Sequence, residues 1–158
     1  MSEISEKYDS TADTMKHIDT VRDYLDIVIG DMERRSLVHD DSKLHGLEKE
    51  TFDEFTPKLK DSTYGSDEYK GFLAAMKPAL DHHYAANSHH PEHFGEAGIR
   101  GMNLLDVVEM LCDWKAATMR HANGDIRASI EINQKRFGYS DELKQIFLNT
   151  LPLLEGHT

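Results

Sequence analysis

The stretch NLLDVVEMLCDWKAATMRH, residues 103–121, decides the fold class. It is rich in apolar residues, and a projection at about 100° per residue places four polar residues on one narrow stripe: Asp106, Glu109, Asp113 and Arg120. Most of the remaining helix surface is apolar, so the pattern predicts a largely buried helix that ends at Asn123-Gly124. Taken alone, the polar stripe is more often a solvent-facing surface than a functional one.

Helical spacing recurs on both sides of this stretch. Five further segments have apolar residues at intervals of three and four: 12–33, 47–56, 67–86, 125–137 and 141–151. We expect Pro57 to end the second of these helices and Pro78 to kink the third, with a short helical turn at 37–40. No segment alternates as a strand does. The sequence therefore predicts an all-α fold, a compact bundle of about six to seven helices.

Length and charge favour one soluble domain. The 158 residues suit a single domain, 1–158, with its core over about 12–151 and short flexible termini. A formal net charge of −11 argues against a nucleic acid duplex as partner. The N-terminal MSEISEKYDS lacks a signal pattern, and no apolar run approaches the length of a membrane span. We expect no membrane partner and a cytoplasmic location, in the host cytoplasm if the chain is phage-encoded.

Histidines are concentrated in one segment. The chain has ten, and five of them stand within residues 82–93: His82, His83, His89, His90 and His93. Residues 87–101 contain Pro91 and three glycines, so we expect a loop between two helices, which is a frequent place for function. The alternatives are a solvated loop or adventitious metal binding.

One or two divalent ions are the cofactor that these residues predict. A first ion is expected on a mixed nitrogen and oxygen set that suits Mn, Fe, Co, Zn or Mg: His17, His39, Asp40 and Asp113. The histidines of the cluster are expected to hold a second ion: His83, His89 and His90. Two ions roughly 3.5–4 Å apart clamp a phosphoryl group and activate water. Because His17 lies on the apolar stripe of 12–33, its alternative role is that of a hydrogen-bonded core histidine.

The order H…HD…D, with HDDSK at residues 39–43, resembles the HD-domain superfamily of all-helical metal-dependent phosphohydrolases. This resemblance implies that Lys43 lies beside the site and contacts a substrate phosphate. His83 followed by His89-His90 looks like the dinuclear branch, which adds histidines before the final aspartate. The strings KHIDTV, LVHDDSK, HHYAANSHHPEH and VVEMLCDWKAA, over about 14–120, are also similar to a family of small uncharacterised bacterial and phage proteins.

These features predict a metal-dependent phosphohydrolase that uses activated water on a nucleotide or a similar small phosphate ester. Asp40 or, alternatively, Asp113 is expected to help orient the water. Some HD nucleotidases have an acidic catalytic residue in the segment of Glu54, although a solvated charge is the alternative here. Arg100 is expected to contact phosphate or to lie plainly on the surface. The alternative functions are a dinuclear iron oxygenase and a nucleotide- or metal-binding protein without turnover, and a homo-oligomer is compatible with each of them.

Overall fold

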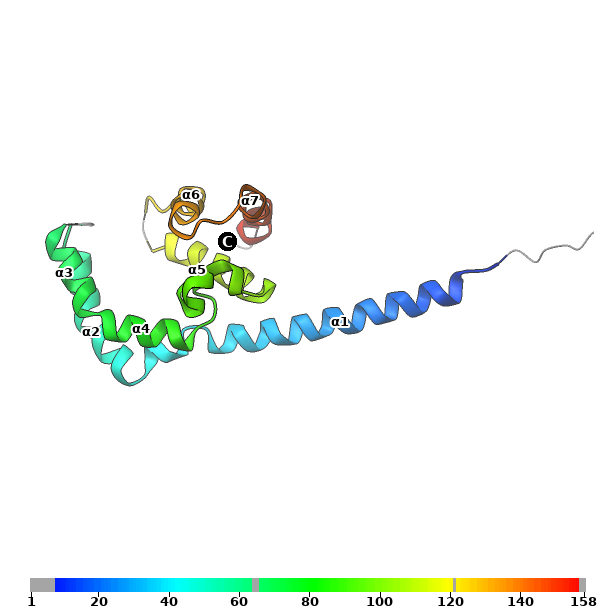
Figure 1. Ribbon diagram of the computed structural model, residues 1–158, viewed down its shortest axis with the longest axis horizontal. Helices are drawn as coiled ribbons and strands as arrows, with labels where there is room; N and C mark the ends of the chain where they lie inside the picture. The colour runs from blue at the N-terminus through cyan, green and yellow to red at the C-terminus, as the bar shows by residue number, and fades with distance from the viewer. Residues whose placement is uncertain (1–7, 64–65, 121, 157–158) are drawn as a thin grey trace, which may run out of the picture. The chain divides into compact units, whose positions relative to one another are not determined.

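The computed structural model describes residues 8–63, 66–120 and 122–156. Seven α-helices and two 3-10 helices make up these residues, which confirms the predicted all-α fold (Figure 1). The chain divides into two units, residues 1–38 and 39–158, and each is described by itself below. The organisation as one domain stays a prediction. Among the described helices, none combines the length and apolar character that crossing a bilayer requires.

The first unit contains one long helix, α1 (Thr11–Val38). It runs beyond the predicted end at residue 33, because residues 34–38 contain neither Gly nor Pro and both Arg34 and Arg35 pair with Asp31 one turn earlier. None of its residues is buried. Because the unit is described by itself, the burial of the apolar stripe that carries His17 stays a prediction.

The second unit begins with a turn and four helical elements: the 3-10 helix η1 (Asp41–Leu44), α2 (Gly46–Asp61), α3 (Asp67–Ala75) and α4 (Lys77–Ala86). The predicted helix over 67–86 is therefore two helices, which separate at Met76. Pro78 stands in the first turn of α4, where its missing N–H leaves no intrahelical bond unmade. Pro57 lies inside α2 and does not end it, and the Lys58–Glu54 ion pair spans this point.

The unit continues with four more elements: η2 (Pro91–Gly101), α5 (Leu104–Thr118), α6 (Ile126–Phe137) and α7 (Asp141–Glu155). The predicted loop 87–101 is thus mostly 3-10 helix, interrupted where Gly95 and Gly98 take positive φ angles of 56° and 51°. Helix α5 ends before the predicted Asn123-Gly124, and the predicted last residue, His121, lies outside the described residues.

The described core joins α5, α6 and α7, which lie together in Figure 1. Its buried members are Met110, Leu111, Ile126, Ile130, Tyr139, Phe147 and Leu151. Trp114 of α5 packs edge-to-face on Phe147, with ring centroids 5.8 Å apart. Packing against this core fixes the rotation of α5 about its axis. It therefore also fixes the direction in which the polar residues on the adjoining face of α5 point.

Candidate metal centre

Four segments of the second unit bring six predicted ligands together. His39 and Asp40 precede η1, His83 belongs to α4, His89 and His90 follow α4, and Asp113 belongs to α5. Asp40 has a left-handed backbone with φ 56°, which is uncommon for a residue other than glycine. This turn allows the adjacent side chains of His39 and Asp40 to reach one site, which a regular helix would not allow.

The larger group of possible ligands consists of Asp40, His83, His89 and His90, whose ligand atoms all lie within 4.8 Å of one another. His83 Nε2 lies 2.9 Å from His90 Nε2 and 3.3 Å from Asp40 Oδ1. His89 Nε2 lies 3.4 Å from the same Asp40 oxygen. Three imidazole nitrogens and one carboxylate oxygen form a donor set suited to zinc and its neighbours in the first transition row.

Two buried polar atoms of this group make no hydrogen bond within the described part of the chain. Among the side chains that the structure describes, Asp40 Oδ1 and His89 Nε2 are buried without a hydrogen-bond partner. Leaving a buried polar group unsatisfied costs about 1–3 kcal/mol, and native proteins rarely do so. A cation between these atoms would supply both missing interactions, so the residues fit a metal ion.

A second, overlapping group consists of His39, His89 and Asp113. His39 Nε2 lies 3.8 Å from Asp113 Oδ1 and 3.7 Å from Asp40 Oδ2. His89 belongs to both groups through one atom, Nε2, which lies near Asp40 Oδ1 and near Asp113 Oδ2. Because one imidazole nitrogen binds one metal ion, His89 can serve only one of the two groups at a time. A second ion would therefore rely on His39, Asp113 and Asp40 Oδ2, the oxygen that Lys43 Nζ contacts at 2.7 Å.

The two groups differ in their protonation. Burial lowers the pKa of His90 to about 3 and also lowers the pKa of His83. Asp113 beside the ring raises the pKa of His39 to about 9, although burial opposes this shift. Burial disfavours the charged form of Asp40, but the neighbouring His89 and Lys43 hold its pKa well below the usual range. At neutral pH His83 and His90 are thus uncharged and Asp40 is charged, while His39 retains its proton.

Two carboxylates face the Nδ1 atoms of the ligand histidines. Glu109 Oε1 lies 2.9 Å from His39 Nδ1 and 3.2 Å from His89 Nδ1, and it belongs to the polar stripe seen in the sequence. Glu48 Oε2 lies 3.0 Å from His83 Nδ1, and sequence analysis missed this residue. An acidic residue in the first turn of a helix ordinarily complements the helix dipole, so nothing local distinguishes Glu48 from such a residue.

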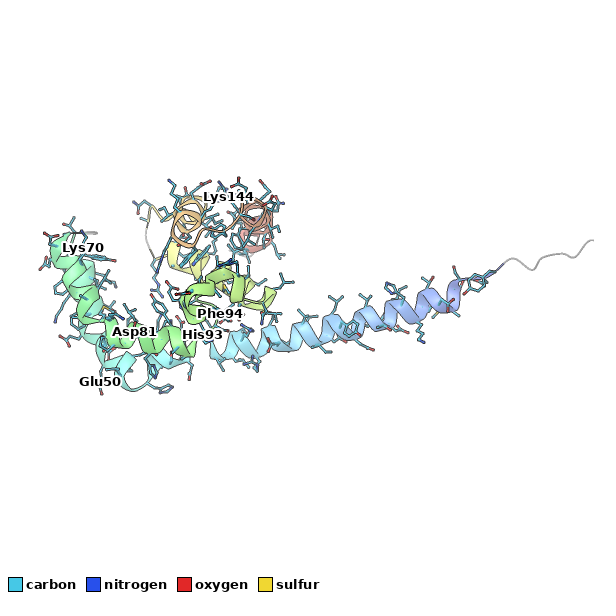
Figure 2. The ribbon with its side chains drawn as sticks, in the orientation of Figure 1. Glu50, Lys70, Asp81, His93, Phe94 and Lys144 are labelled. Atoms are coloured by element: carbon cyan, nitrogen blue, oxygen red, sulfur yellow. The ribbon has the colours of Figure 1, made fainter. Side chains whose placement is uncertain are left out.

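The other histidines of the cluster lie outside both ligand groups. His82 Nδ1 lies 2.6 Å from Glu48 Oε1. His93, labelled in Figure 2, donates from Nδ1 to the carbonyl oxygen of Tyr84 over 2.8 Å.

Three further predicted residues have other surroundings. His17 belongs to the first unit, so its part in the site stays a prediction. Glu54 is exposed and pairs with Lys58 at 2.7 Å. Arg100 is exposed and lines a cavity of about 550 Å³ with other η2 residues, residues 137–140 and Leu143. Their roles as general acid and phosphate contact also stay predictions.

Comparisons with known proteins give one match. No curated protein and no solved structure matches this chain. Residues 6–153 match a protein family described as "Family of unknown function (DUF5662)". This match covers nearly all of the sequence, and the chain therefore belongs to the DUF5662 family.

Proposed function

We propose that this chain is a metal-dependent phosphohydrolase whose metal ion is held by Asp40, His83, His89 and His90. The observation that carries the proposal is the pair of buried atoms described above, Asp40 Oδ1 and His89 Nε2, which lack hydrogen-bond partners among the described residues. They lie 3.4 Å apart in a group of otherwise suitable donors. When bound, a divalent ion would neutralise charge on a phosphoryl group and lower the pKa of a water molecule.

Positive side chains beside the metal group support an anionic substrate. Lys43 Nζ contacts Asp40 Oδ2 at 2.7 Å and lies 5.3 Å from the centre of the Phe52 ring. Its ammonium can exchange the Asp40 contact for a substrate phosphate without occupying a ligand position. His39, with its pKa near 9, holds a second positive charge at the same edge. The HD-like order of the ligands supports a nucleotide or a similar phosphate ester as the substrate.

One observation favours a second candidate, a dinuclear iron oxygenase. The group His39, His89 and Asp113 adjoins the first one and offers ligands for another ion. Such an enzyme would require iron and consume oxygen, whereas hydrolysis of a phosphate ester leaves the oxidation state of the metal unchanged and consumes no oxygen.

The test is hydrolysis of a substrate panel with Mn²⁺ or Co²⁺. Nucleoside mono-, di- and triphosphates and cyclic dinucleotides are incubated with the protein, and phosphate and nucleotide products are measured. We expect Lys43→Met to retain metal and to lose roughly 10²–10³-fold in rate, because one charged contact to the transition state is removed. Lys49→Met is the matched control, since Lys49 is exposed and pairs with Asp53.

The outcomes separate the candidates. If the wild-type protein hydrolyses no member of the panel but consumes oxygen when loaded with iron, the phosphohydrolase proposal is wrong and the oxygenase takes its place. Retention of an unchanged nucleotide would instead indicate a binding protein. Full activity of Lys43→Met would remove only the role given to this lysine.

A further inference from the structure

Glu48 is a fully buried carboxylate next to the metal group. It stands in the first turn of α2, and its exposed fraction is 0%. Burying a carboxylate is costly unless hydrogen bonds compensate the lost water. The partners of Glu48 therefore indicate why an acidic residue stands at this position.

Three side chains surround the carboxylate. Ser42 Oγ donates to Glu48 Oε2 at 2.9 Å, and His83 Nδ1 lies 3.0 Å from the same oxygen. His82 Nδ1 lies 2.6 Å from the other oxygen, Oε1. An ionised carboxylate can only accept hydrogen bonds, so His83 places its proton on Nδ1. The bare Nε2 of His83 then faces His90 Nε2 and Asp40 Oδ1.

Asn87 also lies beside His83 Nδ1, and its hydrogen bonds are compatible with this tautomer. Its Nδ2 lies 3.1 Å from His83 Nδ1, but it also donates to Ser42 Oγ at 2.9 Å and to the carbonyl oxygen of His83 at 2.8 Å. The amide thus has two other acceptors. The hydrogen bond from His83 to a charged carboxylate is the stronger one, so Glu48 determines where the proton of His83 resides.

We propose that Glu48 is a positioning residue of the metal centre, which holds the Nδ1 proton of His83 and so presents Nε2 to the metal. Glu109 has the same relation to His39 and His89, so α2 and α5 each supply one carboxylate that contacts two histidines. Carboxylates behind ligand histidines fix ring orientation and raise the basicity of the ligand nitrogen. The inference rests on the proposed metal centre.

The first experiment needs no variant. Nitrogen-15 NMR of the metal-free wild-type protein reports which ring nitrogen of each histidine carries the proton. We expect the proton of His83 on Nδ1. A proton on Nε2 would overturn the inference, whatever the metal content of the protein.

The second experiment compares Glu48→Gln with Glu50→Gln. Glu50 is exposed on the same helix and is labelled in Figure 2. In Glu48→Gln we expect the proton of His83 to move to Nε2 and the affinity for Zn²⁺ or Co²⁺ to fall roughly 10–100-fold, measured by competition with a chelator. Glu50→Gln should change neither property. Wild-type affinity in Glu48→Gln would overturn the role of Glu48, whereas wild-type protein that binds no metal would overturn the metal centre itself.

Discussion

At the scale of single residues, protonation distinguishes the two ligand groups. His83 and His90 have lowered pKa values and lie in the group of Asp40, His83, His89 and His90. His39, in the other group, has its pKa raised to about 9 by the neighbouring Asp113. A metal ligand must be deprotonated, so an ion that binds His39 has to displace a proton, whereas an ion that binds His83 and His90 meets rings that are already neutral.

Proton release during metal titration tests this distinction. At pH 7.5 we expect a second equivalent of Zn²⁺ to release more protons than the first, because His39 retains its proton there and burial keeps His83 and His90 neutral. Isothermal calorimetry in two buffers with different ionisation enthalpies measures this release. His39→Gln should abolish the second release and preserve the first binding event. Proton release with the first equivalent that disappears in His39→Gln would make His39 a ligand of the first ion.

At the scale of elements, the first turn of α5 is hydrogen-bonded to the segment that contains His89 and His90. Asn103 caps the helix by accepting hydrogen bonds from Leu105 N and Asp106 N, and Asp106 Oδ2 accepts a bond from Asn103 N. Asp106 is buried, and its Oδ1 accepts a 2.6 Å hydrogen bond from Ser88 Oγ, next to His89 in the chain. The cap of α5 therefore also holds the segment that carries two candidate metal ligands, His89 and His90.

Removal of this cap should lower stability. We expect Asn103→Ala to reduce the free energy of unfolding by about 1 kcal/mol, because two backbone N–H groups lose their acceptor. Urea denaturation measures the loss as a lower midpoint concentration, with the slope of the unfolding free energy against urea concentration unchanged. Asn149→Ala is the control, since Asn149 is exposed within α7, where alanine is the better helix former. Equal unfolding midpoints for Asn103→Ala and the wild-type protein would contradict the role given to the capping box.

At the scale of the molecule, the candidate ligands join segments that are far apart in sequence. Asp40, His83, the pair His89-His90 and Asp113 come from four successive segments of the second unit. An unfolded chain does not hold these side chains together, so we expect a metal ion to bind the folded state in preference and to stabilise it.

Thermal unfolding measures this stabilisation. At a metal concentration of 100 times Kd the gain is about 2.7 kcal/mol. For a chain of this size that corresponds to a rise in Tm of roughly 5–10 °C. Asp40→Ala should lose the rise, while Asp41→Ala should keep it because Asp41 is exposed and contacts His45. An equal rise in both variants would place the metal elsewhere.

The all-α class and most of the helices followed from the sequence alone. The spacing of apolar residues is a local property of the backbone, and it identified the helices over 103–121, 125–137 and 141–151 within a few residues. Prolines were less informative. Whether Pro57 ends a helix or lies within one depends on whether the rest of the helix outweighs one lost hydrogen bond, and the sequence does not reveal that balance.

The selection of site residues needed the tertiary structure. His82 and His83 are adjacent in sequence, yet only His83 belongs to a ligand group, because successive residues of a helix point about 100° apart. Glu48 resembles any acidic residue at a helix start until α4 places two histidines against it. Residue types and their order predicted that a metal site is present. Which atoms converge on it was decided by the packing of segments distant in the chain, and no local pattern records that packing.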